Sequence, residues 1–226
     1  MKLIYHGHSC IEIQLADGTN LLIDPFITGN PVSDLIAEKV KTDVILVTHG
    51  HDDHVGDTVS IAKKNEALVV GIVEIANFVE KQGISSHGMN LGGKHDFSFG
   101  RVQLVPALHS SGYDYQGETL YMGEPAGIIF QAEGKTIYHA GDTALFTDMK
   151  LLNVFYDIDM AFLPIGDNFT MGPEEAGIAA EYIQAKTVVP IHYNTFDLIR
   201  QDASAFVDRL RTGTGKVMLV GDSIEL

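Results

Sequence analysis

The chain has 226 residues, 45% of them hydrophobic and 20% charged, and its 30 acidic against 15 basic side chains give a formal net charge of −15 with the histidines neutral. This balance excludes partners that are bound by neutralising phosphates, because affinity for nucleic acid rests on clustered Lys and Arg. At this length we expect a single domain over residues 1–226 with a sizeable core.

Neither secretion nor membrane insertion is expected. Cys10 is the only cysteine, so no intrachain disulfide can form, and a lone thiol favours a reducing compartment. The first residues lack the apolar segment of a signal peptide, and no apolar run approaches the roughly 20 residues of a spanning helix. We therefore expect a cytoplasmic protein in which Cys10 is buried as a small hydrophobe.

The first part of the chain is rich in predicted strands. They fall at residues 2–6, 10–15, 21–23 and 44–47, and the Asp17-Gly18 pair between two of them is a hairpin signal. The apolar run at 44–47 predicts a strand that is buried on both faces. Helical periodicity follows at residues 72–79.

The later part predicts alternating helices and strands. Strands are expected at 102–105, 127–131 and 136–138, with a second hairpin at Glu133-Gly134. Helices are then expected at about 145–155, 173–183 and 202–210, and strands at 160–163, 187–191 and 217–220. This α/β pattern predicts two sheets with helices on their outer faces.

The strongest motif places four metal-ligand side chains within six residues, directly after the strand at 44–47: His49, His51, Asp53 and His54. A histidine-rich surface turn is the alternative, and it predicts no distant partners. However, His109, Asp142 and His192 each follow another apolar strand. Because ligands in α/β sheets gather beyond the carboxyl ends of strands, we expect these side chains to meet at one metal site.

Seven candidate ligands exceed the need of one ion, since a catalytic zinc takes about three protein ligands and keeps one open position. Two divalent ions are therefore expected, with a carboxylate bridging them to reduce their repulsion. Either Asp142 or Asp53 is that bridge. Imidazole and carboxylate ligands without thiolate suit Zn, Mn, Fe or Ni, and zinc is the default.

The H-x-H-x-D-H pattern of residues 49–54, together with the metal-ligand residues that follow later strands, resembles the metallo-β-lactamase superfamily. The resemblance covers nearly the whole chain. The resemblance implies a four-layer αβ/βα sandwich of two mixed sheets. It also implies that His49, His51 and His109 hold the first metal, that Asp53, His54 and His192 hold the second, and that Asp142 bridges them. Residues 7–10, 22–25, 138–143 and 190–193 resemble a branch of small metal-dependent hydrolases related to ascorbate-phosphate lactonase and the N-acyl phosphatidylethanolamine phospholipase.

The sequence differs from other branches of the superfamily, and these differences narrow the choice of function. Flavodiiron oxidoreductases place Glu where His51 stands and carry a flavin domain. RNA-processing members bring an extra domain or a basic arm, and glyoxalase-type thioesterases add a helical carboxyl-terminal domain. Secreted zinc β-lactamases have a signal peptide and usually lack a histidine at the position of His54. A compact intracellular hydrolase remains.

Other side chains have weaker signals. His8 is a candidate proton donor or oxyanion partner, or else a structural histidine. Tyr193 is a candidate substrate contact, or else a packed tyrosine. Asp24 is expected to orient a ligand imidazole, and His139 to pack against or orient the site. The Gly- and Tyr-containing segment 109–125 is expected to cover the substrate, with an ordinary loop as the alternative.

The resulting hypothesis is a hydrolase that uses a metal-bridging hydroxide to attack a small ester, lactone or phosphodiester, with Asp53, His8 and Tyr193 as catalytic candidates. An anionic substrate is favoured because two ions would attract it. An iron-dependent oxidoreductase and a non-catalytic metal-binding protein are the alternatives. We expect a small-molecule substrate, no nucleic acid and no membrane insertion, and leave a homo-oligomer open.

Overall fold

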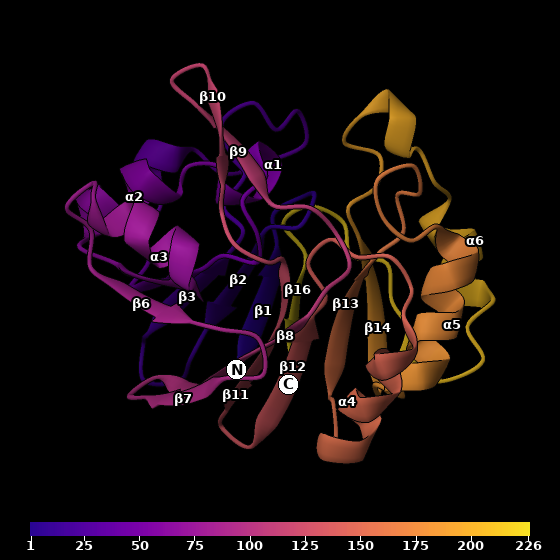
Figure 1. Cartoon of the computed structure of the whole chain (residues 1–226). Coiled ribbons are helices and arrows are strands. Elements are labelled where there is room, and N and C mark those ends of the chain that lie inside the picture. Colours follow the sequence, from indigo (N-terminus) through magenta and orange to yellow (C-terminus); the bar gives the residue numbers. More distant parts are fainter.

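Two mixed sheets form the centre of the computed structural model, which describes residues 1–226 (Figure 1). The first sheet has the strand order β16-β1-β2-β3-β4-β5-β6. Its strands, in chain order, are β1 (Lys2–Tyr5), β2 (Ile11–Gln14), β3 (Asn20–Ile23), β4 (Val44–Leu46), β5 (Leu68–Ile72), β6 (Ser86–Met89) and β16 (Ser223–Glu225). Neighbours from β16 to β3 are antiparallel, and those from β3 to β6 are parallel.

The second sheet repeats this division, with the order β15-β14-β13-β12-β11-β8-β7. Its strands are β7 (Lys94–Phe97), β8 (Gly100–Pro106), β11 (Ala126–Ala132), β12 (Lys135–His139), β13 (Met160–Pro164), β14 (Thr187–Ile191) and β15 (Thr214–Gly215). Pairs from β7 to β12 are antiparallel and those from β12 to β15 parallel. Several strands of both sheets therefore direct their carboxyl ends to the same region.

Helices cover the outer faces of the two sheets (Figure 1). Those beside the first sheet are α2 (Thr58–Asn65) and α3 (Val73–Glu80), and those beside the second are α4 (Lys150–Phe155), α5 (Pro173–Ile183) and α6 (Ala203–Asp208). The remaining short elements are α1 (Asp52–Val55) and the 3₁₀ turns η1 (Ala37–Lys39), η2 (Thr147–Met149) and η3 (Asp197–Ile199). The expected four-layer sandwich is confirmed. None of the helices has the length and hydropathy needed to span a bilayer.

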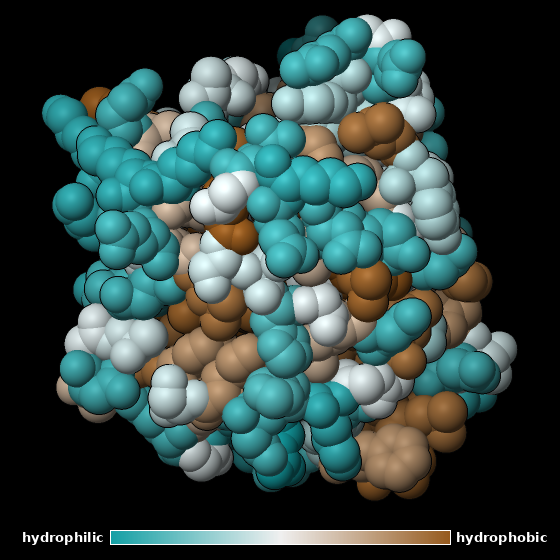
Figure 2. Space-filling model, turned by 60° about the vertical axis from the view of Figure 1, so that its left-hand side comes forward, coloured by the Kyte–Doolittle hydropathy of each residue, from teal (hydrophilic) through white to brown (hydrophobic).

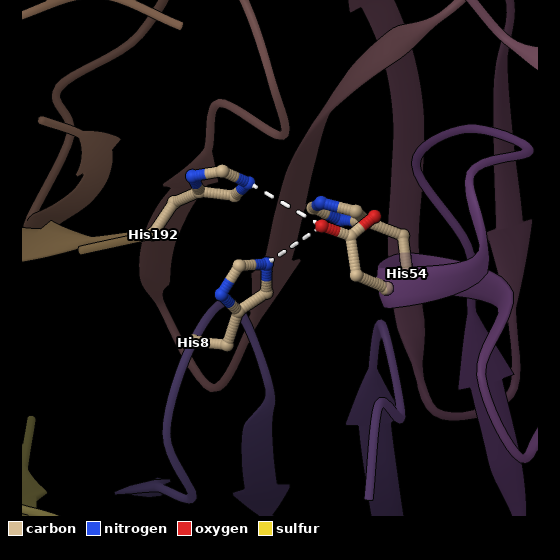
Figure 3. A group of neighbouring side chains, drawn as sticks. His8, His54 and His192 are labelled. Atoms are coloured by element: carbon tan, nitrogen blue, oxygen red, sulfur yellow. Dashed lines mark hydrogen bonds and ion pairs between the residues drawn. The ribbon is translucent and has the colours of Figure 1, made fainter. Parts of the chain in front are cut away.

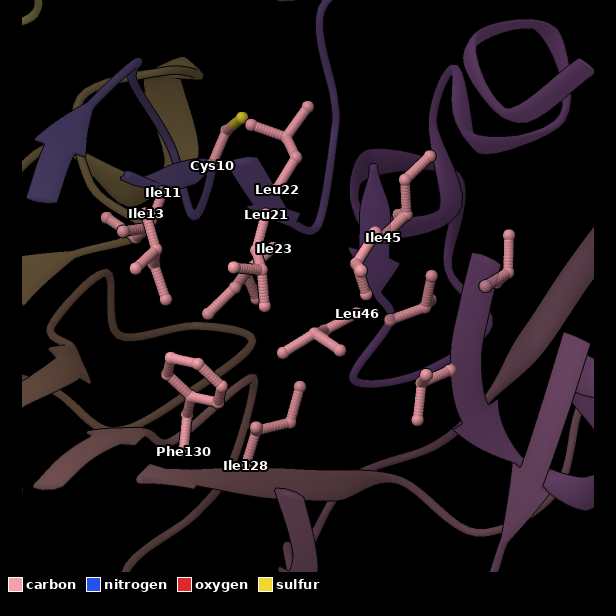
Figure 4. Packing of buried hydrophobic residues seen from close by; sticks show 14 of the residues in the cluster. Cys10, Ile11, Ile13, Leu21, Leu22, Ile23, Ile45, Leu46, Ile128 and Phe130 are labelled. Carbon is pink, nitrogen blue, oxygen red and sulfur yellow. The ribbon is translucent and has the colours of Figure 1, made fainter. Parts of the chain in front are cut away.

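The main core lies between the sheets (Figure 4). Residues of β2 alternate between buried and partly exposed, so that Ile11 and Ile13 face inward. They face Ile128 and Phe130 of the second sheet, and Phe130 is fully buried. Each such side chain contributes roughly 1.5–3 kcal/mol of transfer free energy. Cys10 is fully buried in the same cluster, as expected.

Hydrophilic side chains cover much of the face shown in Figure 2, and hydrophobic ones show between them in the middle of the face and at its lower right. This distribution agrees with a charged fraction of 20% and a surplus of acidic residues. The surface is therefore where most of the net charge of −15 resides, while the buried carboxylates are few.

Both predicted hairpins are present. The Glu133-Gly134 pair joins β11 to β12 as a two-residue loop, with φ of 54° and 72°. Two positive φ values are the requirement of a type I′ turn, which matches the twist of the strands that it connects. The turn at Asp17-Gly18 connects β2 to β3, again with a positive φ at the glycine.

The predicted strand at 217–220 is wrong. The chain leaves the second sheet after β15 and joins the first sheet only at β16. Residues 217–220 form the crossing between the sheets, where Met218 is buried but Leu219 is 70% exposed. The apolar residues of this segment reflect its partial burial where the chain crosses between the sheets. The predicted helix at 145–155 is also interrupted, as η2 followed by α4.

The segment 109–125 is a hairpin and not an irregular loop. Strands β9 (Gly112–Tyr115) and β10 (Glu118–Tyr121) pair with each other and with no other strand. In Figure 1 the hairpin projects above the edge of the first sheet, near α1. Tyr113 and Tyr115 anchor it on Phe78 of α3, each with a ring-centroid distance of 5.2 Å.

Candidate metal centre

Seven predicted ligands and His8 form two adjoining clusters. The first cluster contains His49, His51, His109 and Asp142, and the second contains His8, Asp53, His54 and His192. Within each cluster one potential ligand atom per residue lies within 4.8 Å of the others. The residues come from the ends of β4, β8, β12 and β14, from the β1–β2 turn and from α1. The metal-ligand side chains that follow these strands thus lie close together, as expected.

The local backbone explains why α1 can carry two of these side chains. His51 is the N-cap of α1 with an extended backbone, and Asp53 and His54 occupy its first turn. Gly56, at the end of α1, packs so closely on the backbone of Pro25 and Phe26 that a Cβ would overlap them. The short helix is therefore held against the loop that follows β3.

Three imidazole nitrogens face one another in the first cluster. His51 Nδ1 lies 3.0 Å from His49 Nε2 and 3.2 Å from His109 Nε2. Asp142 Oδ2 lies 3.9 Å from His49 Nε2 and 3.6 Å from His109 Nε2. Neutral imidazoles that direct lone pairs at one another repel unless a cation lies among them, so this donor set fits a metal ion.

Asp142 connects the two clusters. Its Oδ2 lies 3.0 Å from His192 Nε2, and its Oδ1 lies 3.2 Å from His54 Nε2. Asp53 Oδ2 lies 3.7 Å from His192 Nε2 and 3.2 Å from His8 Nε2, both within the second cluster. Of the two carboxylates expected as a possible bridge, Asp142 is the one that faces nitrogens of both clusters.

Buried contacts fix which nitrogen of two histidines faces the centre. Thr48 Oγ1 donates to Asp24 Oδ2 at 2.7 Å, so it accepts from His49 Nδ1 at 2.9 Å. Asp24 Oδ2 also accepts from His54 Nδ1 at 2.7 Å. When these two rings are neutral, Nε2 is left free to bind a metal, and holding the ring in that form is the usual task of such outer contacts. The expected role of Asp24 matches this geometry.

Burial and charge set the protonation of the metal-free clusters. Burial lowers the pKa of His49 well below its ordinary value, and the neighbouring His54 lowers it further. Burial would also lower the pKa of His192, but Asp142 outweighs it and raises that pKa to about 9. Burial would raise the pKa of Asp142, yet His192 and His54 hold it well below its usual range. A divalent ion would replace these protons as the positive charge beside Asp142.

Several buried atoms of the centre form no hydrogen bond of normal geometry, although His54 Nε2 and Asp142 Oδ1 lie 3.2 Å apart. The atoms concerned are His54 Nε2, Asp142 Oδ1 and both ring nitrogens of His192. Buried polar atoms are nearly always paired in folded proteins, and an unpaired group calls for a ligand or a special role. Together with the facing imidazoles, these atoms show that the residues present fit two metal ions.

Comparison with known proteins identifies the family. A family model described as a beta-lactamase superfamily domain matches residues 19–193. A UPF0173 metal-dependent hydrolase from Anoxybacillus flavithermus is 59% identical over the full length of both chains, and one from Bacillus cereus is equally similar. The chain belongs to the UPF0173 metal-dependent hydrolases of the beta-lactamase superfamily.

A solved structure supports the same assignment. Igni18, a metallo hydrolase from Ignicoccus hospitalis, is 36% identical and superposes with a TM-score of 0.89, covering 100% of this chain and 98% of its own. The resemblance inferred from the H-x-H-x-D-H motif is thereby confirmed at the level of the superfamily, as is the expectation of a metal-dependent hydrolase.

In this UPF0173 hydrolase a cavity of about 570 Å³ lies beside the two clusters. His51 and Asp53 line it from the candidate centre. The other lining residues are Phe26, Phe196, Asp52, Gly112, Asp114 and Thr119, and no Lys or Arg is among them. Gly112, Asp114 and Thr119 belong to the β9–β10 hairpin, so the expectation that segment 109–125 covers a substrate has a geometric basis.

The structure brings most of the singled-out residues together, but not Tyr193. The Tyr193 side chain is partly buried against the hydrophobic cluster between the second sheet and its helices, and it does not line this cavity. His139 Nε2 donates to the carbonyl of Ser9, and its Nδ1 accepts from Gly141 N, so the ring supports the turn that carries Asp142.

Sequence reasoning missed three hydroxyl side chains around the centre: Thr48, Ser110 and Thr195. Ser110 Oγ lies 3.1 Å from His51 Nε2, and Thr195 Oγ1 lies 2.9 Å from His8 Nδ1. Thr48 and Ser110 adjoin the candidate ligands His49 and His109 in sequence, and this adjacency is a signal that the sequence does contain. Thr195 carries no comparable signal, because its contact with His8 spans 187 residues.

Proposed function

We propose that this chain is a dinuclear metal-dependent hydrolase that cleaves a small ester, lactone or phosphodiester. The observation that carries the proposal is the pair of donor clusters that share Asp142 beside a cavity. His49, His51 and His109 would hold the first ion, and Asp53, His54 and His192 the second. Zinc is the first choice, with Mn, Fe or Ni also suited to nitrogen and oxygen ligands.

Two bound divalent ions would supply a hydroxide nucleophile at neutral pH and polarise the bond under attack. The chain's own residues prepare the place for this chemistry. Asp142 is 2% exposed on the inner side of the centre, whereas Asp53 and His51 are partly exposed at the cavity. A substrate therefore approaches past His51 and Asp53.

The catalytic candidates outside the ligand set differ in their geometry. His8 is completely buried and contacts Asp53, so it is suited to supporting the second cluster more than to direct proton transfer to a substrate. Tyr193 is left out of the proposed reaction, because its side chain packs away from the cavity.

The lining of the cavity bears on the substrate. Asp52 and Asp114 belong to the lining, and burial together with the charge of Asp114 raises the pKa of Asp52. An anionic substrate would meet positive charge only at the ions themselves. This supports a small substrate whose reacting group alone contacts the centre, and it argues against nucleic acid. We place the enzyme in the cytoplasm, as a lone buried thiol suggests.

The test is metal content and hydrolysis in two variants, His51→Ala and Asp142→Ala, with His87→Ala of β6 as the matched control. Purified proteins would be analysed for bound metal and assayed with activated phosphodiester, carboxyl ester, lactone and thioester substrates. We expect at least a roughly 100-fold loss of hydrolysis and loss of metal in both variants, because each removes a donor that the chain cannot replace. Unchanged activity in either variant would contradict the proposal.

A further inference from the structure

His8 occupies a fixed and fully buried position. It lies in the turn between β1 and β2 with 0% exposure and a φ of 57°, which is a left-handed backbone conformation. Its carbonyl oxygen accepts from the backbone N–H of His192 at 2.9 Å and from the Tyr5 hydroxyl at 3.2 Å. The ring of His8 stands 4.1 Å from the ring of His192, centroid to centroid. The turn therefore delivers this imidazole to the second cluster.

The two ring nitrogens of His8 have different surroundings. Nε2 lies 3.2 Å from Asp53 Oδ2 and belongs to the group of donor atoms that also includes His54 and His192 (Figure 3). Nδ1 points away from the cluster and lies 2.9 Å from Thr195 Oγ1. One nitrogen thus faces the centre while the other is held by a neutral oxygen.

Two candidate ligands, His49 and His54, share this two-sided arrangement, whereas His6 and His139 do not. In His49 and His54, Nε2 faces the centre while Nδ1 is held by Thr48 and Asp24. His6 instead has both nitrogens on carboxylates, and His139 has both on the backbone. Ligand histidines characteristically give their second nitrogen to an oxygen, and His8 follows that rule.

The distances between the donor atoms of each cluster also suit metal coordination. Bonds of about 2.0–2.1 Å around a tetrahedral ion put neighbouring ligand atoms about 3.3 Å apart. The distance of 3.2 Å from His8 Nε2 to Asp53 Oδ2 matches this value, as do the distances of 3.0 and 3.2 Å within the three-histidine cluster.

We propose that His8 is a further protein ligand of the second metal ion, binding through Nε2, and that Thr195 positions its ring. The proposal rests on the proposed dinuclear centre. With His8, Asp53, His54 and His192 as donors and Asp142 shared with the first ion, the second ion would have five donors from the chain, one more than a tetrahedral zinc site takes. The first ion, with one donor fewer and with His51 at the cavity, is then the one better placed to meet a substrate.

The direct test uses the wild-type protein. Long-range ¹H–¹⁵N correlation spectra of the histidine rings would be recorded for the metal-free protein and after two equivalents of Zn²⁺, with His8→Gln used to assign the His8 signals. We expect the Nε2 resonance of His8 to move to the metal-bound range together with those of His54 and His192. A His8 Nε2 that still carries its proton, or does not shift, overturns the proposal.

Zinc titration of variants separates a ligand from a residue that merely orients Asp53. Glutamine can still donate to Asp53 but is a poor zinc ligand, so His8→Gln and His8→Ala should both weaken one of two zinc ions at least 10-fold. Thr195→Val should weaken the same ion about 10-fold, and His87→Ala should change neither. Full zinc affinity in His8→Gln would overturn the proposal and leave the dinuclear centre intact. A wild-type protein that binds none of Zn²⁺, Mn²⁺, Fe²⁺ or Ni²⁺ would instead overturn both.

Discussion

Two single carboxylates lie at the cavity beside the candidate centre. Asp52 and Asp114 stand at the rim, and Asp114 accepts from Thr119 within the hairpin. Both are exposed, so their effect on a substrate is screened by salt and modest in size. The two proposed ions attract anions, whereas these side chains repel them, and the balance can be measured.

We expect the double variant Asp52→Asn and Asp114→Asn to favour anionic substrates. Its kcat/KM for an activated phosphodiester, relative to that for a neutral activated ester, should rise about threefold or more at low ionic strength and return toward the wild-type ratio at high salt. Asp148→Asn, an exposed position away from the cavity, is the control. An unchanged ratio would mean that the rim does not influence the substrate.

His6, a titratable residue outside the seven predicted ligands, predicts that the free energy of unfolding depends on pH. His6 is buried between Asp34 at 2.8 Å and Glu12 at 3.0 Å. Burial alone would lower the pKa of His6, but the two carboxylates raise it above its ordinary value. A raised pKa stabilises the fold fully below the unfolded value of about 6.5, and this contribution is lost as the pH rises through the folded value.

His6→Gln should therefore cost more stability at pH 6 than at pH 9. The free energy of unfolding would be measured by urea denaturation of the metal-free protein at both pH values, which keeps the proposed ions out of the comparison. His87→Gln, whose partner is another histidine and not a carboxylate, is the control. Equal destabilisation at pH 6 and pH 9 would rule out a charged His6.

At the scale of elements, the turn after β4 and the segment after β8 depend on each other. Gly50 N donates to Ser111 Oγ at 2.9 Å, between the ligand candidates His49 and His51. A Cβ at Gly50 would overlap Met122 Cβ and lie 2.7 Å from Met122 Cγ. Glycine is required here by close packing and not by a positive φ.

Gly50→Ala should accordingly push the segment 109–122 away and displace His109. We expect a loss of about 1–3 kcal/mol in unfolding free energy, the usual cost of overpacking, and weaker zinc binding in the same variant. Met122→Gly added to it should restore part of the zinc affinity but cost further stability, because Met122 is buried in the core. Gly177→Ala in α5, where a Cβ meets nothing within 4 Å, should not destabilise the protein. Wild-type zinc affinity in Gly50→Ala would show that the two segments are not coupled.

Sequence reasoning located elements whose signals are local. The helix at 173–183 and the strand at 187–191 match α5 and β14 at both ends. Pro173 at the first helical position marks the helix, and four β-branched residues around Pro190 mark the strand. The motif at 49–54 was likewise evident in the sequence, as were His109, Asp142 and His192 at the ends of predicted strands.

What could not be predicted depends on contacts between distant segments. The hairpin β9–β10 owes its place to Tyr113 and Tyr115 packing on Phe78, some 35 residues earlier. Residues 217–220 cross between sheets because β16 pairs with β1, which no local pattern announces. The grouping of His8 with Asp53, His54 and His192 similarly follows from a turn whose carbonyl is held by His192 N.

At the scale of the whole molecule, the candidate centre lies where the two sheets meet. His49 follows a strand of the first sheet, whereas His109, Asp142 and His192 follow strands of the second. Asp142 faces histidines from both halves, at 3.2 Å from His54 and 3.0 Å from His192. Metal binding should therefore link the halves of the sandwich as well as prepare the reaction.

The stoichiometry of zinc binding tests this account most directly. Metal-free protein would be titrated with Zn²⁺ by calorimetry, and bound zinc counted by elemental analysis after removal of the excess. We predict two zinc ions per chain in the wild-type protein and loss of this dinuclear state in Asp142→Ala, since Asp142 serves both clusters. One ion or none per wild-type chain, or two ions still bound without Asp142, would contradict a dinuclear centre bridged by that residue.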